Sequence, residues 1–257
     1  MTTTDNIASF SHSFHIYNHC TDKSGLLRVK TLCDLLNDVA EMHTVYQHAD
    51  VATLNQNGMT WMLRRILLSM PELPAQGANV SVTTWNPELS GLLVPRLYRV
   101  SGKDKDCLHA FAYTEWLMVN LHTMRPERPT EMMKSIAGLS DERIPAGVPL
   151  LSRAEQKTGF MPDDTWSEAC CFKAGYADID FNGHLTQSSY IQRMIDAHEF
   201  SFLERHRMRD IEVVYAHEIK PESTFYVRFR REGDMVSYAV LNQERNLLHA
   251  WARARWQ

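Results

Sequence analysis

The chain lacks both a long apolar run and a paired set of cysteines. None of its 257 residues belongs to a stretch of roughly 18 consecutive apolar residues, the length that a membrane-spanning helix needs. Residues 1–13 are polar and contain no apolar core of the kind that a secretory signal peptide carries. The sequence therefore predicts a cytoplasmic protein that does not act in a membrane.

The five cysteines are an odd number, and no two of them have the Cys-x-x-Cys spacing. A disulfide framework would use an even number, and a cysteine zinc site would use that spacing. We therefore expect unpaired thiols and no bound metal ion, and nothing else in the sequence implies an organic cofactor.

The chain also lacks a basic excess. It has 27 lysine and arginine residues against 31 aspartate and glutamate residues, which gives a formal net charge of −4. Because proteins that bind nucleic acid usually carry a clustered positive charge, nucleic acid is not an expected partner. Hydrophobic residues make up 44% of the chain, which suits one large domain or two domains of about 100–150 residues.

Two pairs of segments indicate an internal repeat. Leu108–Trp116 and Leu248–Trp256 are identical at five of nine positions. A weaker match relates Asp22–Leu27 to Asp180–Leu185. Because both matches occur in the same order along the chain, they predict the duplication of a unit of about 100–120 residues.

Each copy contains one segment with the apolar spacing of a helix. The spacing predicts a helix from Val29 to about Tyr46 in the first copy and a helix from Leu185 to His206 in the second. The predicted buried faces consist of Val29, Leu32, Cys33, Leu36, Val39 and Ala40 in the first helix, and of Tyr190, Ile191, Met194, Ile195, His198 and Phe202 in the second.

Each helix follows one predicted strand and precedes several more. The expected strands are Ser11–His19, Met59–Leu68, Asn79–Trp85, Pro95–Ser101 and Cys107–Asn120 in the first copy, and Glu168–Gly175, Asp210–Ile219, Ser223–Arg231, Met235–Leu241 and Asn246–Trp256 in the second. Successive strands joined by short turns form an antiparallel sheet, and a single long helix buries its apolar face against such a sheet.

The sequence thus predicts an α+β fold of the double hot-dog type, in which two tandem units each wrap an antiparallel sheet around a long central helix. The expected division is an N-terminal unit at 1–130, a linker at 131–165 and a C-terminal unit at 166–257.

Polar residues gather between the first strand of the second copy and its helix, in Asp180-Phe181-Asn182-Gly183-His184. The start of a helix presents unpaired N–H groups and a partial positive charge, which can polarise a carbonyl and stabilise an oxyanion. Asn182 can add a donor, His184 can move a proton, and Asp180 can orient a side chain or activate water. The alternative is that Asp180 and Asn182 cap the helix beside an incidental histidine.

The repeat bears on this choice, because capping alone would place equivalent residues in both copies. The matched positions are Asp22 and Asp180, Ser24 and Asn182, and Leu26 and His184. The second copy therefore keeps side chains capable of chemistry that the first copy lacks, as expected of a duplicated enzyme that uses one half for catalysis.

Glu218 is a second candidate, near the end of a predicted strand and shortly before Pro221. An alternation of period two places it on one face with Val214 and Ala216. A carboxylate on a partly apolar face suits a general base, whereas the alternative is an exposed glutamate at a strand end.

These motifs resemble the active site of plant and bacterial acyl-ACP thioesterases, which have a double hot-dog fold. Asp180-x-Asn182-x-His184, six residues before Tyr190, is similar to the motif of that family. Residues 214–218, Val-Tyr-Ala-His-Glu, are similar to its Glu-Tyr-x-x-Glu pattern, in which the final glutamate is catalytic. The resemblance extends roughly from Phe14 to Trp256. It implies a catalytic set of Asp180, Asn182, His184 and Glu218 in a bacterial-type enzyme of fatty acid biosynthesis, which hydrolyses fatty acyl-ACP to free fatty acid and ACP.

The sequence departs from the family at three positions. Val214 replaces the first glutamate of the strand pattern, and Gln187 replaces an asparagine of the helix start. Ile219 stands where many plant enzymes have a cysteine, so that position has no thiol and the resemblance implies attack by water.

The acyl chain of such a substrate needs an apolar tunnel. We expect the first unit to supply its walls, including Trp61, Met62, Leu63 and Ile66, although a core role is equally open for these four. Acyl carrier protein is acidic, so a basic surface is expected near the site. The candidates are Arg205, His206, Arg207 and Arg209 in one group and Arg228, Arg230 and Arg231 in another.

Other functions stay open at this point: an acyl-CoA thioesterase, a hot-dog dehydratase and a non-catalytic acyl-binding protein. The chain already contains a pair of hot-dog units, so both a monomer and a homodimer agree with the sequence.

Overall fold

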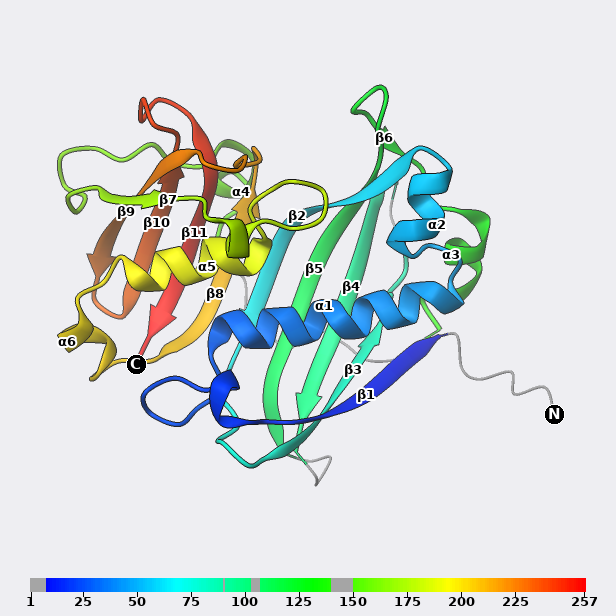
Figure 1. Cartoon of the computed structure of the whole chain (residues 1–257), viewed down its shortest axis with the longest axis horizontal. Helices are drawn as coiled ribbons and strands as arrows, with labels where there is room; N and C mark the ends of the chain where they lie inside the picture. The colour runs from blue at the N-terminus through cyan, green and yellow to red at the C-terminus, as the bar shows by residue number, and fades with distance from the viewer. Residues whose placement is uncertain (1–7, 90, 103–106, 140–149) are drawn as a thin grey trace. The chain divides into compact units, whose positions relative to one another are not determined.

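The computed structural model describes residues 8–89, 91–102, 107–139 and 150–257. The chain forms two compact units (Figure 1). The first unit comprises Met1–Arg64 and Met70–Ala146, and the second comprises Arg65–Ser69 and Gly147–Gln257. The second unit therefore includes a short piece from the first half of the chain, which differs from the contiguous division expected from the sequence.

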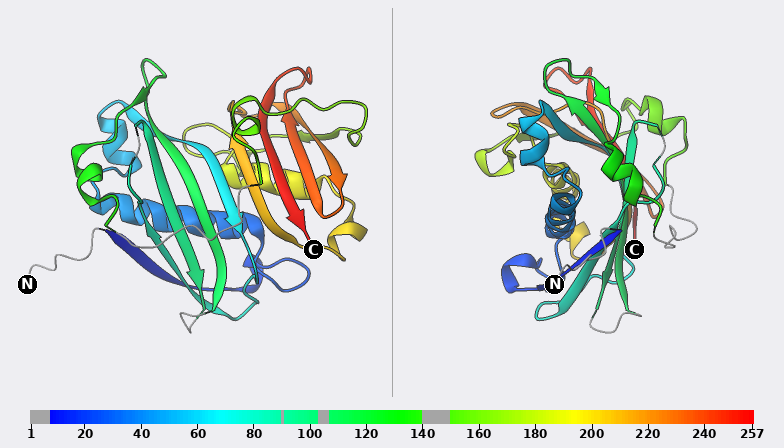
Figure 2. Two further views of the ribbon diagram at one scale, coloured as in Figure 1. Left: turned by 180° about the vertical axis from the view of Figure 1, so that it is seen from behind. Right: turned by 90° about the vertical axis from the view of Figure 1, so that its right-hand side faces the viewer.

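The first unit is an antiparallel sheet with one long helix on a face. Its strands follow the order β1-β3-β4-β5, with β2 next to β5. Figures 1 and 2 show helix α1 lying along one face of this sheet as a separate layer. The elements in chain order are β1 (Ser9–His15), η1 (Asn18–Cys20), α1 (Val29–Tyr46), α2 (Val51–Gln56), β2 (Met59–Ser69), β3 (Asn79–Trp85), β4 (Leu93–Ser101), β5 (Leu108–Asn120), β6 (Pro126–Glu127) and α3 (Glu131–Ile136).

Helix α1 forms where the apolar spacing predicts it. Six apolar residues at helical spacing are buried in the face that packs against β1 and β3, which confirms the predicted face. These residues are Val29, Leu32, Cys33, Leu36, Val39 and Ala40. The helix begins after Arg28, whose backbone is extended (φ −64°, ψ 140°).

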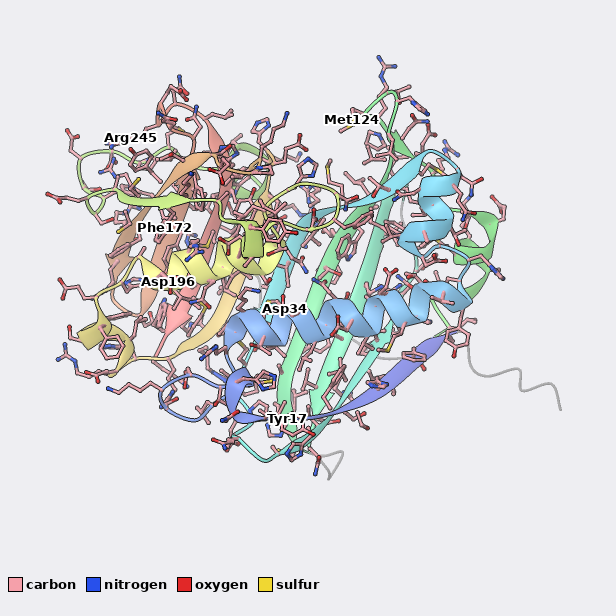
Figure 3. The ribbon with its side chains drawn as sticks, in the orientation of Figure 1. Tyr17, Asp34, Met124, Phe172, Asp196 and Arg245 are labelled. Atoms are coloured by element: carbon pink, nitrogen blue, oxygen red, sulfur yellow. The ribbon has the colours of Figure 1, made fainter. Side chains whose placement is uncertain are left out.

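The second unit repeats this arrangement. Its strands follow the order β7-β9-β10-β11-β8, and Arg65–Ser69 of β2 pairs with β8. Phe172, labelled on β7 in Figure 3, stacks on Phe225 of β9 with 5.8 Å between ring centroids. The elements are α4 (Glu155–Thr158), β7 (Cys170–Lys173), η2 (Tyr176–Asp178), α5 (Gln187–Asp196), α6 (Phe200–Leu203), β8 (Met208–Tyr215), β9 (Thr224–Glu232), β10 (Met235–Leu241) and β11 (Leu248–Trp256).

The helix predicted from Leu185 to His206 is shorter in the structure and ends at Asp196, so that prediction was wrong in length. His198 turns into the core, where its Nε2 lies 2.6 Å from the hydroxyl of Tyr238. Glu199 is extended (φ −62°, ψ 145°), and the short helix α6 follows it.

Strand β8 also ends earlier than predicted, at Tyr215 instead of Ile219. The amides of Ala216 and His217 both donate to the carbonyl of His249, at 2.9 and 3.1 Å. Because two successive amides share one acceptor, the regular ladder cannot continue past this point. Glu218 therefore lies in the connection that follows β8.

The two units share the same irregularity as well as the same strand order. In the first unit the pairing of β4 with β5 shifts register just before Ser101 pairs with Leu108. In the second unit the pairing of β10 with β11 shifts just before Leu241 pairs with Leu248. Each unit is an antiparallel sheet packed on a helix, so the chain has the predicted α+β, double hot-dog fold.

The expected linker, 131–165, contains the short helices α3 and α4 in its described part, and residues 140–149 lie outside the described residues. The amides of Leu150 and Leu151 donate to Oε2 of Glu212, at 2.7 and 2.9 Å. These bonds attach the end of the segment to β8. None of the helices in the described residues has the length and apolar content needed to cross a membrane.

Candidate functional site

A tight turn carries the predicted polar motif of the second unit. The amide of Asp180 donates to the carbonyl of His184 at 2.8 Å, and the amide of Gly183 donates to the carbonyl of Asp180 at 3.0 Å. Oδ1 of Asp180 accepts from the amide of His184 at 3.1 Å. Gly183 has a φ of 80°, a left-handed conformation that favours glycine. The carboxylate of Asp180 therefore fixes the backbone that presents His184.

The first unit contains the same turn. The amide of Asp22 donates to the carbonyl of Leu26 at 2.8 Å, and the amide of Gly25 donates to the carbonyl of Asp22 at 3.0 Å. Oδ1 of Asp22 accepts from the amides of Ser24 and Leu26, at 2.8 and 3.4 Å, and Gly25 has a φ of 77°. The aspartate thus has a structural role common to both units, and the units differ in the side chains that the turn presents.

The turn of each unit is bonded to the segment that follows the strand after the helix. The amide of Leu185 donates to the carbonyl of Ile219 at 2.9 Å in the second unit. The amide of Leu27 donates to the carbonyl of Pro74 at the same distance in the first. Ile219 and Pro74 therefore occupy matching positions.

In each unit a histidine near the start of a strand, β5 or β11, supports this match. Nδ1 of His249 lies 3.2 Å from the carbonyl of His217, and Nδ1 of His109 lies 2.9 Å from the carbonyl of Glu72. His217 and Glu72 therefore also match. The residue between the two matched positions is Glu218 in the second unit and Leu73 in the first.

The structure brings His184 and Glu218 together. Nε2 of His184 lies 3.4 Å from Oε2 of Glu218, and the two side chains are 35% and 36% exposed. In the first unit the matching residues are Leu26 and Leu73, which carry no acid or base. An imidazole and a carboxylate in contact and within reach of solvent can exchange protons with each other and with a bound molecule.

The environment predicted for Glu218 was wrong. The period-two pattern placed it on one face with Val214 and Ala216, but Val214 is buried, whereas Ala216 and Glu218 are exposed. The alternation ends because β8 ends at Tyr215. Glu218 is held instead through the hydrogen bonds of its neighbours His217 and Ile219.

Asn182 lies at the exposed tip of the turn. Phe181 beside it is 71% exposed, and Tyr176 just before the turn is 98% exposed. The turn and the short helix η2 before it therefore present an amide and two aromatic side chains to a molecule arriving from solvent.

Sequence reasoning assigned Tyr190 to the helix core and missed its polar contact. The side chain is buried, and its hydroxyl donates to the carbonyl of His217 at 3.2 Å. Its ring packs edge-on against Tyr215 with centroids 5.4 Å apart. Burial raises the pKa of Tyr190, and the carboxylates of Glu218 and Asp180 raise it further. The phenol therefore remains a donor at neutral pH.

Helix α5 begins directly after this turn. Its N-cap is Thr186, whose Oγ1 accepts from the amide of Ser189 at 3.3 Å. The first helical residue is Gln187, and the Tyr215 hydroxyl donates to its carbonyl at 3.2 Å. Among the described residues, Oε1 of Gln187 is a buried acceptor without a hydrogen-bond partner. Gln187, which departs from the asparagine of the resemblance, thus has an unsatisfied oxygen at the helix start.

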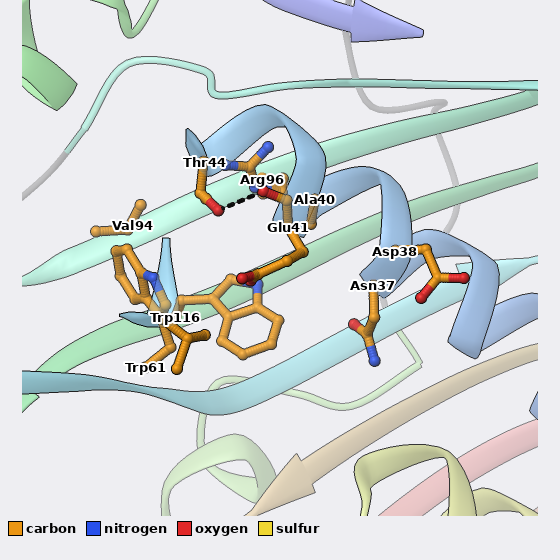
Figure 4. A pocket seen from close by; sticks show the side chains of 10 residues that line it. Asn37, Asp38, Ala40, Glu41, Thr44, Trp61, Val94, Arg96 and Trp116 are labelled. Atoms are coloured by element: carbon orange, nitrogen blue, oxygen red, sulfur yellow. Dashed lines mark hydrogen bonds between the residues drawn. The ribbon is translucent and has the colours of Figure 1, made fainter. Parts of the chain in front are cut away.

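A cavity of about 210 Å³ lies in the first unit, between α1 and the sheet (Figure 4). Trp61 is the one predicted tunnel residue that lines it, and the indole Nε1 of Trp61 donates to the carbonyl of Ala49 at 2.8 Å. Met62 is exposed, and Ile66 is buried within the second unit. The lining residues are Asn37, Asp38, Ala40, Glu41, Thr44, Val51, Trp61, Val94, Arg96 and Trp116.

One side of this cavity is charged. The buried guanidinium of Arg96 lies 2.8 Å from Nδ1 of His43 and donates to Oε1 of Gln47 at 3.0 Å. Burial lowers the pKa of Arg96 and raises the pKa values of Glu41 and Asp38. The cavity therefore combines apolar walls with partly desolvated charges, which the strand and helix patterns did not predict.

Two family models match most of the chain. The N-terminal domain of the acyl-ACP thioesterases matches residues 8–136, and the C-terminal domain of the same family matches residues 163–256. The boundaries enclose both turns and both helices described above.

A plant relative agrees with this match. The chain is 22% identical over 221 residues to a chloroplastic palmitoyl-acyl carrier protein thioesterase of Gossypium hirsutum, which covers 83% of this chain and 53% of that protein. The chain thus spans about half the length of that relative.

Two solved structures share the fold. An acyl-ACP thioesterase from Bacteroides thetaiotaomicron has a TM-score of 0.83 at 23% identity over 97% of this chain and 98% of its own. A 12:0-ACP thioesterase from Umbellularia californica has a TM-score of 0.77 at 14% identity over 97% of both chains. With both of its domains matched by the family models, the chain belongs to the acyl-ACP thioesterase family.

Proposed function

We propose that the protein hydrolyses fatty acyl-ACP thioesters to free fatty acid and ACP, as a step of fatty acid biosynthesis. The observation that carries this proposal is the contact of His184 with Glu218, at 3.4 Å, in one of two units whose turns have the same backbone hydrogen bonds. Family membership supports the same activity.

Glu218 is the proposed general base. Its carboxylate takes a proton from water, and the resulting hydroxide adds to the thioester carbonyl to give a tetrahedral oxyanion. The oxyanion then collapses and the C–S bond breaks. His184 passes the proton that Glu218 took from water to the departing thiolate, which leaves as a thiol. Proton transfer through His184 is supported by its 3.4 Å contact with Glu218.

The remaining members of the catalytic set bind and orient. Asn182, exposed at the tip of the turn, offers its amide N–H groups to the substrate carbonyl. The N-terminus of α5 contributes its partial positive charge to the oxyanion. Asp180 holds the turn through its bond to the His184 amide. This division leaves Glu218 as the base and gives Asp180 a positioning role.

The cavity of the first unit is the proposed site for the acyl chain. Its apolar residues, which include Trp61, Val94 and Trp116, suit a hydrocarbon chain. Met62, Leu63 and Ile66 do not line it. We therefore base the chain-binding proposal on Trp61 and the other lining residues.

Acyl carrier protein is the proposed partner. Arg205 and Arg207 are exposed, whereas Arg228 and Arg230 of the second group are half-buried, which favours the first predicted basic group as its contact. In the second group, Arg228 donates to the carbonyls of Ser167, Asp163 and Trp166, so its charge is held against the protein's own backbone. We also propose that the protein is cytoplasmic and of bacterial origin, that it forms a homodimer, and that it acts without a membrane or nucleic acid as partner.

The test compares acyl-ACP and acyl-CoA of the same chain lengths, with release of free fatty acid as the readout. The wild type is assayed beside Glu218→Gln and beside Glu222→Gln, which alters an exposed carboxylate paired with Lys173. We expect rapid hydrolysis of acyl-ACP, retained in the Glu222 variant and lost in the Glu218 variant. Equal rates on both thioesters would refute the carrier assignment, and no fatty acid from either would refute hydrolysis.

A dehydratase is the second candidate, because a histidine beside a carboxylate is also the pair that such an enzyme needs. A 3-hydroxyacyl thioester distinguishes the two reactions. Formation of an enoyl thioester would support dehydration, whereas free 3-hydroxy acid would support hydrolysis. Binding of acyl thioester without either product would identify an acyl-binding protein.

A further inference from the structure

The two units differ in polarity at three matched positions around the candidate site. The turn and the segment after β8 give two of them, His184 against Leu26 and Glu218 against Leu73. The third is on the helix, because α1 begins at Val29 and α5 at Gln187. The fourth residue of each helix is Leu32 in the first unit and Tyr190 in the second.

Tyr190 contacts the backbone beside the proposed base. Its hydroxyl donates to the carbonyl of His217 at 3.2 Å, and Nδ1 of His249 lies 3.2 Å from the same oxygen. In the first unit the matching carbonyl of Glu72 lies 2.9 Å from Nδ1 of His109. Leu32 has no donor to add there. The tyrosine contact thus occurs in the same unit as His184 and Glu218.

We infer that Tyr190 is a positioning residue for the proposed hydrolysis: its hydroxyl fixes the peptide between His217 and Glu218 and so holds the Glu218 carboxylate against His184. The inference rests on the proposed function, because it takes Glu218 as the base. It also assigns to Tyr190 a role that the first unit, with Leu32, does not need.

Glu218 needs such support because of where it lies. It follows the end of β8 and its side chain is 36% exposed, so neither a strand ladder nor core packing fixes its rotation. A displacement of about 1 Å of a catalytic group can lower a rate a hundredfold. A hydrogen bond to the preceding carbonyl restrains the peptide that carries the Glu218 side chain.

The position of Tyr190 suits this task. Its side chain is 4% exposed and packs edge-on against Tyr215, so the ring has little freedom. Burial and the two nearby carboxylates of Glu218 and Asp180 raise its pKa, which keeps the hydroxyl protonated as a donor. The hydroxyl therefore bonds the His217 carbonyl throughout the neutral range.

The first test is Tyr190→Phe, which removes only the hydroxyl. We expect kcat on acyl-ACP to fall about tenfold with KM changed less than about twofold, because the base is displaced while substrate contacts remain. Tyr238→Phe is the matched control: it removes a buried hydroxyl of the same unit, bonded to His198 and Trp256. That variant should lose thermal stability and keep kcat when assayed well below its melting temperature.

The Tyr238→Phe control distinguishes a specific effect on Glu218 from a general loosening of the unit. A wild-type kcat for Tyr190→Phe would overturn the inference. An equal fall in kcat for both variants would also overturn it, since general loosening of the unit would then explain the effect.

The second test is a double-mutant cycle with Glu218→Gln on the full chain. If Tyr190 acts through Glu218, adding Tyr190→Phe to Glu218→Gln changes kcat by less than about twofold. A further fall as large as that caused by Tyr190→Phe alone means that the hydroxyl acts independently, and the inference fails. If Glu218→Gln alone keeps the wild-type rate, the assignment of the base in the proposed function fails instead.

Discussion

Oδ1 of Asp180 accepts a hydrogen bond from the amide of His184 at 3.1 Å, as Oδ1 of Asp22 accepts one from the amide of Leu26 at 3.4 Å. The same bond thus occurs in a unit with the acid–base pair and in a unit without it. An aspartate that occurs in both turns is explained by their shared geometry, without a role in activating water.

This relationship predicts unequal effects for two substitutions of Asp180. Asp180→Asn retains an oxygen acceptor and should keep acyl-ACP hydrolysis within about threefold of the wild type. Asp180→Ala removes the acceptor and should lower the rate by about tenfold or more, with a loss of about 1 kcal/mol in stability. Steady-state kinetics and urea unfolding measure both effects.

Asp22→Ala is the control for this prediction, because it breaks the matching turn of the first unit. It should cost similar stability and leave proton transfer at His184 intact. If Asp180→Asn is as inactive as Asp180→Ala, the charge of Asp180 takes part in the reaction and Glu218 is not the sole base.

A second prediction concerns the buried ion pair of the second unit. Nη1 of Arg65 lies 2.6 Å from Oε1 of Glu212, whose side chain is 0% exposed, and Glu212 also accepts from the amides of Leu150 and Leu151. Glu212→Gln removes the negative charge that pairs with the mostly buried Arg65 guanidinium. We expect the free energy of unfolding to fall by about 3 kcal/mol.

Urea denaturation followed by circular dichroism tests this loss. Glu222→Gln breaks an exposed pair with Lys173 and should cost less than about 1 kcal/mol. Comparable losses in the two variants would show that burial does not govern the strength of the Arg65 pair.

The third prediction follows from His198. Burial, then the positive charges of Arg231 and His206, lower the pKa of His198 to about 4. An unfolded histidine has a pKa of about 6.5, so the unfolded chain binds the proton first as the pH falls. The stability from neutral His198 is therefore complete above pH ~6.5 and is lost as the pH falls toward ~4, by about 3 kcal/mol.

The free energy of unfolding measured from pH ~7 to ~4.5 tests this dependence. Because carboxylates also titrate at the acidic end, the informative quantity is the difference between wild type and His198→Gln. We expect the variant to be less stable at pH 7 and to lose less stability on acidification. Parallel curves for the two proteins would be inconsistent with a lowered pKa at His198.

The fourth prediction concerns the cavity of the first unit. Val51 lines it and is partly buried, so Val51→Phe should fill part of the volume and shift the released fatty acids toward shorter chains. Val45→Phe, at an exposed valine on α1, provides the control. A product profile unchanged by both substitutions would show that the acyl chain does not use this cavity.

Strong periodic patterns predicted much of the fold. Strands β3 and β10 begin and end at the predicted residues, Asn79–Trp85 and Met235–Leu241. Helix α1 spans the predicted Val29–Tyr46, and its apolar residues from Val29 to Ala40 recur at helical spacing on the buried face. The match of Leu108 with Leu248 in the sequence also predicted the duplication. The structure agrees, because the strand register shifts at both of these residues.

Features that depend on individual hydrogen bonds could not be predicted from the periodic patterns. The end of β8 depends on two amides that share the carbonyl of His249, and sequence alternation carries no sign of this. The contact of Tyr190 with His217 lies just past that ending. Comparing Tyr190 with Leu32 in the repeat was the signal that could have identified the tyrosine.

The central claim is that chemistry resides in the second unit because His184 and Glu218 replace leucines there. The most direct measurement is the rate of free fatty acid release from acyl-ACP by His184→Leu, which gives the second turn the residue of the first. We predict a fall of at least about a hundredfold with the melting temperature nearly unchanged, because Asp180 still holds the turn. A rate within about twofold of the wild type would contradict the account.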